Sequence, residues 1–215
     1  CFGFGVAAYA GWGDLTPAVC KNDMGVTDGF KAVNGLLYTS YVESQTVLGE
    51  VLIALGKKGE GEKVLAQIKD LKEEKAPKGS DLTKAIGSSD ASLNAALKEA
   101  DATKLTDEAK SHIKTARLAE FKSIINILAA SIVAAPLTLA AKNAIDSDKT
   151  CATKLTPVVD TVKTIVPLAD NLQKSSKAFD AFAKTAGLPP LTDDEKKKCF
   201  NDLKVADDVK SKISL

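Results

Sequence analysis

Four cysteines and one histidine are the side chains of this chain with the widest chemical range: Cys1, Cys20, Cys151, Cys199 and His112. No two cysteines are spaced as CxxC, and none is spaced with the histidine as a zinc ligand pair. A single histidine cannot build a two-histidine metal site, and as a general base it needs a nucleophile and an orienting carboxylate nearby. Because His112 lies in the charged first turns of a predicted helix, we expect it to be a surface or capping residue.

Cys1 is the most specific signal in the chain, which starts at this residue rather than at a methionine. Cleavage of a signal peptide immediately before a lipid-modified cysteine leaves such a start in bacterial lipoproteins, and Cys1 resembles that class. We therefore expect Cys1 to be a lipid attachment site. Two alternatives are that Cys1 is oxidised to a disulfide, or that the numbering is artificial.

The remaining cysteines, Cys20, Cys151 and Cys199, are disulfide candidates in an oxidising compartment. With Cys1 they allow two bridges in three connectivities. A Cys151–Cys199 bridge suits a helical hairpin whose ends meet, and either a Cys1–Cys20 bridge or a free Cys20 would follow. If Cys1 carries lipid, one thiol is left over.

Residues 1–27 are predicted to form an N-terminal arm or tether. The first thirteen residues carry no charge and contain four aromatic side chains: Phe2, Phe4, Tyr9 and Trp12. Aromatic side chains in an uncharged segment pack against a protein surface or lie in a membrane interface. We expect these four to contact a membrane or a partner, with docking on the chain's own core as the alternative.

The charge balance argues against nucleic acid as a partner. The formal net charge is +1, and Arg117 is the one arginine among 29 basic residues. Arginine supplies the planar donor fork that recognises phosphates and guanine edges, so its scarcity weakens any such site. GxSxG, P-loop and HExxH motifs are absent from the sequence as well. We predict no enzyme activity, no metal and no cofactor.

Apolar residues recur at helical spacing along most of residues 28–215. One stripe covers 28–55 and stops at Gly56, and a short amphipathic stretch ends before Pro77. A weaker stretch over 81–102 is interrupted at 87–89, a strong helix opens at Thr106, and the last long helix is expected from Thr156-Pro157. No stretch alternates with period two over the length of a strand. The prediction is an all-α antiparallel bundle of about four main helices with short accessory helices.

Residues 123–141 contain no charged side chain, a length that a bilayer-spanning helix needs. Three polar residues, Pro136 and many weakly apolar alanines favour a buried core helix instead. Insertion of this segment into a membrane is the alternative.

Together these features predict a non-enzymatic helical-bundle protein of the bacterial cell envelope, periplasmic or cell-surface and anchored through Cys1, or else secreted. It would act by contact with an envelope protein or by self-association. The alternative function is a carrier or sensor of an apolar small molecule, with a cavity opened by helix kinks at Pro136 and Pro167. A membrane-inserting helical protein is a third hypothesis.

Overall fold

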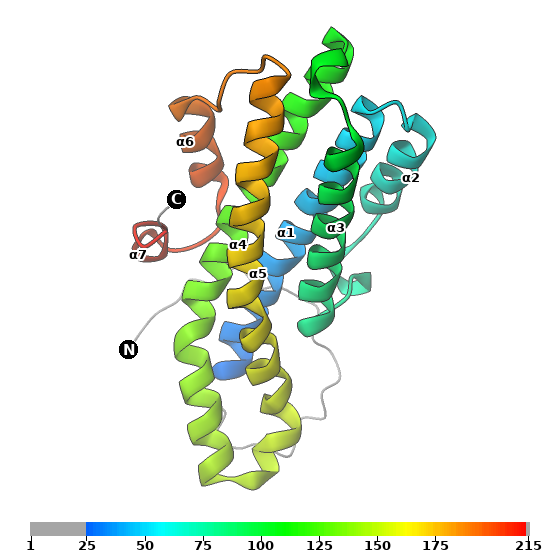
Figure 1. Cartoon of the computed structure of the whole chain (residues 1–215). Coiled ribbons are helices and arrows are strands. Elements are labelled where there is room, and N and C mark those ends of the chain that lie inside the picture. Colours follow the sequence, from blue (N-terminus) through cyan, green and yellow to red (C-terminus); the bar gives the residue numbers. More distant parts are fainter. Residues whose placement is uncertain (1–24, 214–215) are drawn as a thin grey trace.

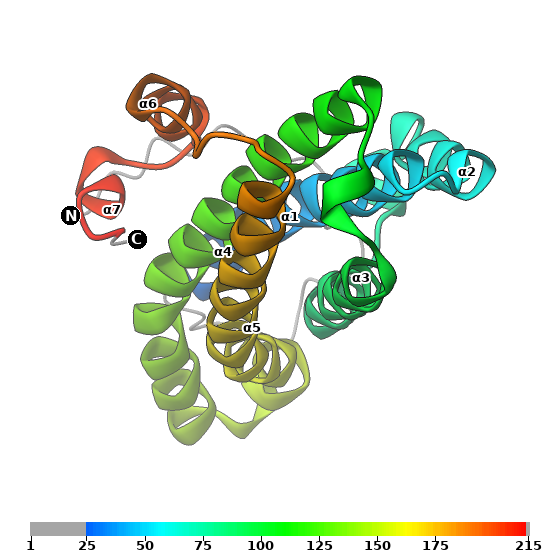
Figure 2. The ribbon, with the colours of Figure 1, turned by 45° about the horizontal axis from the view of Figure 1, so that its top comes forward.

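Four long helices frame the computed structural model, which describes residues 25–213. They are α1 (Val26–Ala54), α3 (Ser80–Glu99), α4 (Asp107–Ser147) and α5 (Ala152–Thr185). Helix α4 packs against α1 and α5, and α3 closes the ring by packing against the same two helices (Figures 1 and 2). The described residues form no strand, so the predicted all-α bundle is confirmed. The predicted antiparallel arrangement is wrong for α3, which runs parallel to α1 and to α5, because α2 reverses the chain between α1 and α3 (Figure 1). Within the ring only α4 runs antiparallel to its neighbours.

Three shorter helices lie outside this ring. Helix α2 (Lys58–Lys69) packs against α1, while α6 (Asp193–Asp202) and α7 (Asp207–Lys210) pack against α4 (Figure 2). Three single 3₁₀ turns complete the described secondary structure: Glu73–Lys75, Ala102–Lys104 and Lys149–Cys151.

Several helix ends follow from local chemistry. The Thr106 hydroxyl accepts a hydrogen bond from the Ala109 backbone N–H and caps α4, as predicted. Thr192 and Glu195 form a reciprocal capping box at the start of α6. Gly56 and Gly187 have φ angles of 80° and 79° just beyond α1 and α5. These left-handed conformations, which glycine adopts without strain, end the two helices.

Two predicted helix boundaries are wrong. Helix α3 runs without interruption through residues 87–89, and α5 begins at Ala152 rather than at Thr156. The Asp148 side chain accepts a hydrogen bond from the Thr150 N–H and starts the 3₁₀ turn that continues directly into α5. Pro157 therefore lies inside α5, together with Pro167, and Pro136 lies inside α4.

The core consists of two apolar clusters stacked along the bundle. One contains Phe30, Leu37 and Ile86, and the other contains Val47, Ile113 and Phe179. Between them every helix of the ring places polar side chains at the same level. We call this set the polar layer; its members are Ser40, Ser44, Gln45, Ser89, Asp90, Asn94, Arg117, Glu120, Ser123, Ser175, Ser176 and Asp180.

Helix α4 is the one described helix that is long and apolar enough to span a membrane, by length and composition alone. Its residues Ile124, Ile127 and Ala130 are buried in the bundle core, each exposing 4% or less of its surface. The first half of the segment therefore packs in the core, whereas only 44% of its most apolar window is buried and Leu139 is 64% exposed. Insertion of the segment into a membrane stays a prediction.

Candidate functional site

The polar layer joins each neighbouring pair of helices in the ring by hydrogen bonds. Between α1 and α4, the Ser123 hydroxyl lies 2.8 Å from the Ser40 hydroxyl and 2.9 Å from that of Ser44. Between α1 and α3, the Gln45 amide donates to the Ser89 hydroxyl at 2.7 Å. A polar group without a partner is costly to bury, so these contacts are what allow hydroxyls at the centre of the bundle.

The other two sides of the ring are joined through carboxylates. Between α3 and α5, the Ser175 hydroxyl donates to Asp90 at 2.8 Å and accepts from the Asn94 amide at 2.7 Å. Between α4 and α5, the Ser176 hydroxyl donates to Glu120 at 3.4 Å. Burial raises the pKa of Asp90, and the hydrogen bond from Ser175 partly offsets that rise.

Arg117 and Asp180 form the outer edge of the polar layer. The guanidinium donates twice to Oδ1 of Asp180, from Nε at 3.1 Å and from Nη2 at 2.6 Å. Its Nη1 donates to the carbonyl oxygen of Pro189, in the segment between α5 and α6. Arg117 is 6% exposed and Asp180 57% exposed, so the pair joins a buried cation to a solvated anion.

Glu120 is the most perturbed acid of the described residues. Desolvation is the largest cause, and the neighbouring Asp180 and Asp90 carboxylates add to it, while Ser176 and Arg117 act in the opposite direction. Together they raise the pKa of Glu120 to about 8. At neutral pH the side chain is therefore mainly a neutral carboxylic acid, which can donate a hydrogen bond as well as accept one.

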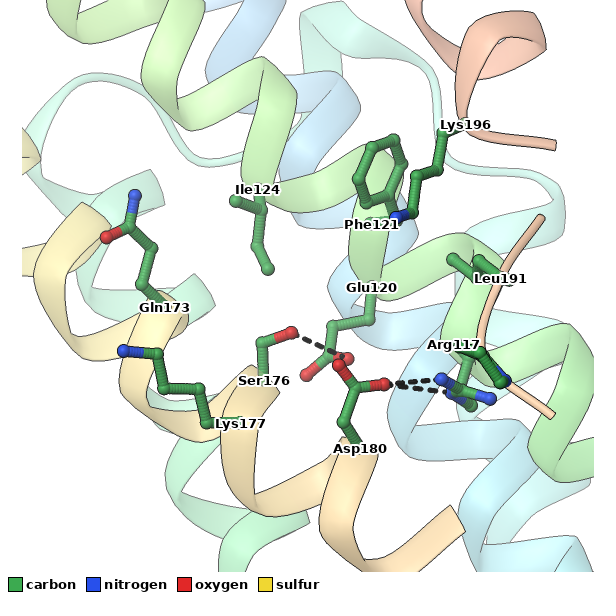
Figure 3. Close-up of a pocket in the computed structure, with 11 residues that line it drawn as sticks. Arg117, Glu120, Phe121, Ile124, Gln173, Ser176, Lys177, Asp180, Leu191 and Lys196 are labelled. Atoms are coloured by element: carbon green, nitrogen blue, oxygen red, sulfur yellow. Dashed lines mark hydrogen bonds and ion pairs between the residues drawn. The ribbon is translucent and has the colours of Figure 1, made fainter. Parts of the chain in front are cut away.

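Glu120 and its neighbours line a cavity of about 340 Å³ between α4, α5 and the start of α6, which we call the outer pocket (Figure 3). Apolar walls come from Phe121, Ile124, Pro190 and Leu191. Seven polar or charged residues also line the cavity: Arg117, Glu120, Gln173, Ser176, Lys177, Asp180 and Lys196. Small-molecule sites in proteins are typically pockets of this size, with apolar walls and a few converging polar groups.

A second, much smaller cavity lies on the inner side of Glu120. This inner cavity has a volume of about 20 Å³ and lies at the centre of the polar layer, between Ser44, Ser89, Asp90 and Ser123. Glu120 and Ile124 line both cavities and so form the wall between them. The inner cavity has room for one water molecule.

A larger hollow of about 450 Å³ lies at the C-terminal end of α1 and is a weaker candidate for a binding site. Its charged side chains already pair with each other, Lys57 with Glu99 at 3.9 Å and Lys104 with Asp101 at 2.9 Å, and they are largely exposed. The outer pocket differs because two of its ionisable groups, Arg117 and Glu120, are buried.

Residues 186–200, which we call the strap, pass along the outer pocket and are fixed to α4 at three places. Besides the Arg117 contact with Pro189, Lys114 pairs with Glu195 at 3.5 Å. The Phe121 and Phe200 rings pack edge to face with centroids 5.9 Å apart. The pocket is therefore held by local contacts of residues 186–200, rather than by the helix kinks proposed from the sequence. Pro136 and Pro167 do not line it.

The predicted cysteine pairing is wrong. Cys199, a residue of α6, is a buried free thiol, and burial raises its pKa. Cys151 is also buried but is disulfide-bonded, so it does not pair with Cys199. Cys1 and Cys20 lie outside the described residues, as do the predicted contact residues Phe2, Phe4, Tyr9 and Trp12. Lipid attachment and membrane or partner contact by this arm stay predictions.

His112 is half-buried, and its side chain contacts another helix, a contact that the sequence did not predict. Its Nδ1 lies 2.5 Å from Oε2 of Glu50, and the two side chains are 29% and 16% exposed. The pair fixes the first turns of α4 to α1. The described residues contain no group of three or more histidine, cysteine or acidic side chains that could hold a metal ion.

Comparison with known proteins gave no relative. No protein-family model, curated protein or solved structure matched the chain.

Proposed function

We propose that this protein is a non-enzymatic binding protein that takes a small amphipathic molecule in the outer pocket. The observation that carries this proposal is the burial of Glu120 and Arg117 in the wall of a cavity of about 340 Å³ that also has an apolar side. A bundle that needed only stability would fill this space with apolar side chains, because buried ionisable groups seldom add to stability. Such groups at a cavity are more typical of recognition.

The proposal develops the carrier or sensor function considered from the sequence. Apolar walls would cover the body of the ligand, and the polar groups would orient its polar end. Protein–protein contact or self-assembly in a cell envelope is the alternative proposal. A protein that is monomeric and binds a small molecule saturably in the outer pocket would favour binding over contact.

A pocket-filling substitution tests the proposal with an uncharged fluorescent probe, N-phenyl-naphthylamine. Gln173 lines the pocket, so Gln173→Trp should fill it and weaken binding about tenfold or more. Lys174→Trp adds the same ring at the next residue of α5, which is exposed and does not line the pocket. It should leave binding unchanged.

Circular dichroism would show whether each variant keeps the helical fold. No saturable binding to the wild-type protein, or equal weakening by both substitutions, would reject the outer pocket as the binding site.

A further inference from the structure

We infer that the outer pocket selects amphipathic molecules whose polar end is an acidic group, attracted by the positive charges of Lys177 and Lys196. This inference rests on the proposed function and adds the chemical class of the ligand. The acidic group can be a carboxylate, sulfonate or phosphate, because all three offer the same anionic oxygens.

The hydrogen-bonding groups of the outer pocket are mainly donors. Arg117, Lys177 and Lys196 can only donate, and the Ser176 hydroxyl carries one further donor proton. Asp180 is the one ionised acceptor of the lining at neutral pH, and its Oδ1 already accepts two hydrogen bonds from Arg117. A ligand that brings acceptor oxygens complements this set better than one that brings further donors.

The charges of the pocket point to the same class. Asp180 compensates Arg117, while neither Lys177 nor Lys196 forms an ion pair with a described residue. With Glu120 neutral, the lining therefore carries two uncompensated positive charges. The two lysines come from different helices, Lys177 from α5 and Lys196 from α6, and lie on different sides of the pocket (Figure 3). Lys177 is exposed and Lys196 is half-buried, and both charges would attract an anion that enters the pocket.

The inner cavity limits where the polar end can lie. It is too small for more than one water-sized group, and Glu120 and Ile124 separate it from the outer pocket. The acidic group therefore stays in the outer pocket with the lysines. Lys196 is half-buried, and the Phe121 ring lines the same pocket (Figure 3). This ring, with Ile124 and Leu191, then covers the apolar body of the ligand.

Two dyes with the same aromatic skeleton test the inference. Anilinonaphthalene sulfonate carries an acidic group, and N-phenyl-naphthylamine lacks it. The wild-type protein should bind the sulfonate about tenfold more tightly, an advantage that shrinks as salt is added. The double variant Lys177→Gln and Lys196→Gln should bind the two dyes equally. Lys197→Gln and Lys198→Gln, exposed positions of α6 outside the pocket, should keep the preference.

The outcomes separate this inference from the proposed function. If neither dye binds saturably, or if Gln173→Trp does not reduce binding, the proposed function fails and this inference fails with it. If the uncharged dye binds as tightly as the sulfonate or more tightly, the pocket binds ligands but does not select an acidic group. Tightest binding of an ammonium analogue of the same skeleton would assign the polar end to Glu120 and Asp180 instead, and would also overturn the inference.

Discussion

Arg117 and Asp180 are joined through one oxygen atom, because both Nε and Nη2 of the guanidinium donate to Oδ1 of the carboxylate. The third nitrogen of the guanidinium donates to the Pro189 carbonyl. One buried side chain on α4 therefore fixes both α5 and the strap over the outer pocket. Lysine has a single ammonium in place of the planar fork and could not make these contacts together.

Replacement of Asp180 by asparagine should destabilise the fold by roughly 1–3 kcal/mol, because the buried guanidinium loses its charged partner. The strap around Pro189 should also become more accessible to proteases. Urea unfolding and mapping of limited-proteolysis products would measure the two effects. Asp170→Asn, at an exposed site of the same helix, is the matched control and should change neither quantity. Equal behaviour of the two variants would contradict this role for Asp180.

Glu120 should make stability fall as pH rises. Below pH 4.5 its side chain is protonated in the folded and unfolded protein alike. Between pH 4.5 and about 8 the unfolded chain releases the proton while the folded protein keeps it, so the free energy of unfolding decreases. Above about pH 8 both states are ionised, and no further loss follows. The decrease between these limits is at most about 1.4 kcal/mol per pH unit.

Glu120→Gln mimics the neutral acid and removes this contribution. The variant should resemble the wild type in acid and be the more stable of the two above pH 8. Thermal unfolding followed by circular dichroism across this range would measure the difference. The groups around Glu120 are Arg117 on its own helix, Asp180 and Lys177 on α5, Asp90 on α3 and Lys196 on α6. A stability difference that does not change with pH would contradict the burial of Glu120 as a neutral acid.

Loss of Ser123 should reduce the free energy of unfolding by more than its own hydrogen bonds contribute, because two other buried hydroxyls depend on it. Ser123→Ala leaves the buried hydroxyls of Ser40 and Ser44 without their shared partner and should reduce stability by roughly 1–2 kcal/mol. The triple variant Ser40→Ala, Ser44→Ala and Ser123→Ala removes the stranded hydroxyls too, so it should be about as stable as the wild type or closer to it than the single variant. Urea unfolding of both would decide this, and a triple variant less stable than Ser123→Ala would reject a shared network.

Two glycines in α2 should respond in opposite ways to alanine. A Cβ atom at Gly61 would lie 2.5 Å from the Gly49 carbonyl oxygen and 3.0 Å from the Ile53 backbone nitrogen. Neither backbone atom can move aside cheaply, so Gly61→Ala should cost roughly 1–3 kcal/mol or separate α2 from α1. A Cβ at Gly59 meets nothing within 4 Å, so Gly59→Ala should stabilise by about 0.5–1 kcal/mol. Urea unfolding and hydrogen exchange in α2 would test the pair.

The fold was largely predictable from the sequence because the apolar stripes on α1 and α4 are long and the Thr106 cap is strong. The start of α5 was misplaced because the local hydrogen bond from the Thr150 N–H to Asp148 starts its first turn early. The other failures depend on tertiary partners. Ser89 looked like part of a helix break, but Gln45 on α1 satisfies its hydroxyl within a continuous α3. His112 looked like a surface residue because nothing in its own helix indicates Glu50, which lies 62 positions away.

The outer pocket could not be predicted in the same way. Its central pair, Arg117 and Asp180, is separated by 63 positions, and the pairing depends on how α4 and α5 align. One usable signal was present: serines interrupt the apolar stripes of α1, α3, α4 and α5, and the one arginine lies close to such a serine. Serines are small and common in helices, however, so only their shared level in the bundle shows that they belong together.

The polar layer also fixes how far each helix can slide along its neighbours. A shift by one turn moves a helix by about 5.4 Å, and an apolar core can accept such a shift with little change in buried area. Here it would press the Ser123 hydroxyl against side chains such as Leu37 or Val47, with no acceptor in reach. The hydrogen bonds of the polar layer therefore fix the relative positions of all four helices along the bundle. The layer selects one register among several that the apolar stripes alone would allow, and so sets where the wall of the outer pocket is assembled.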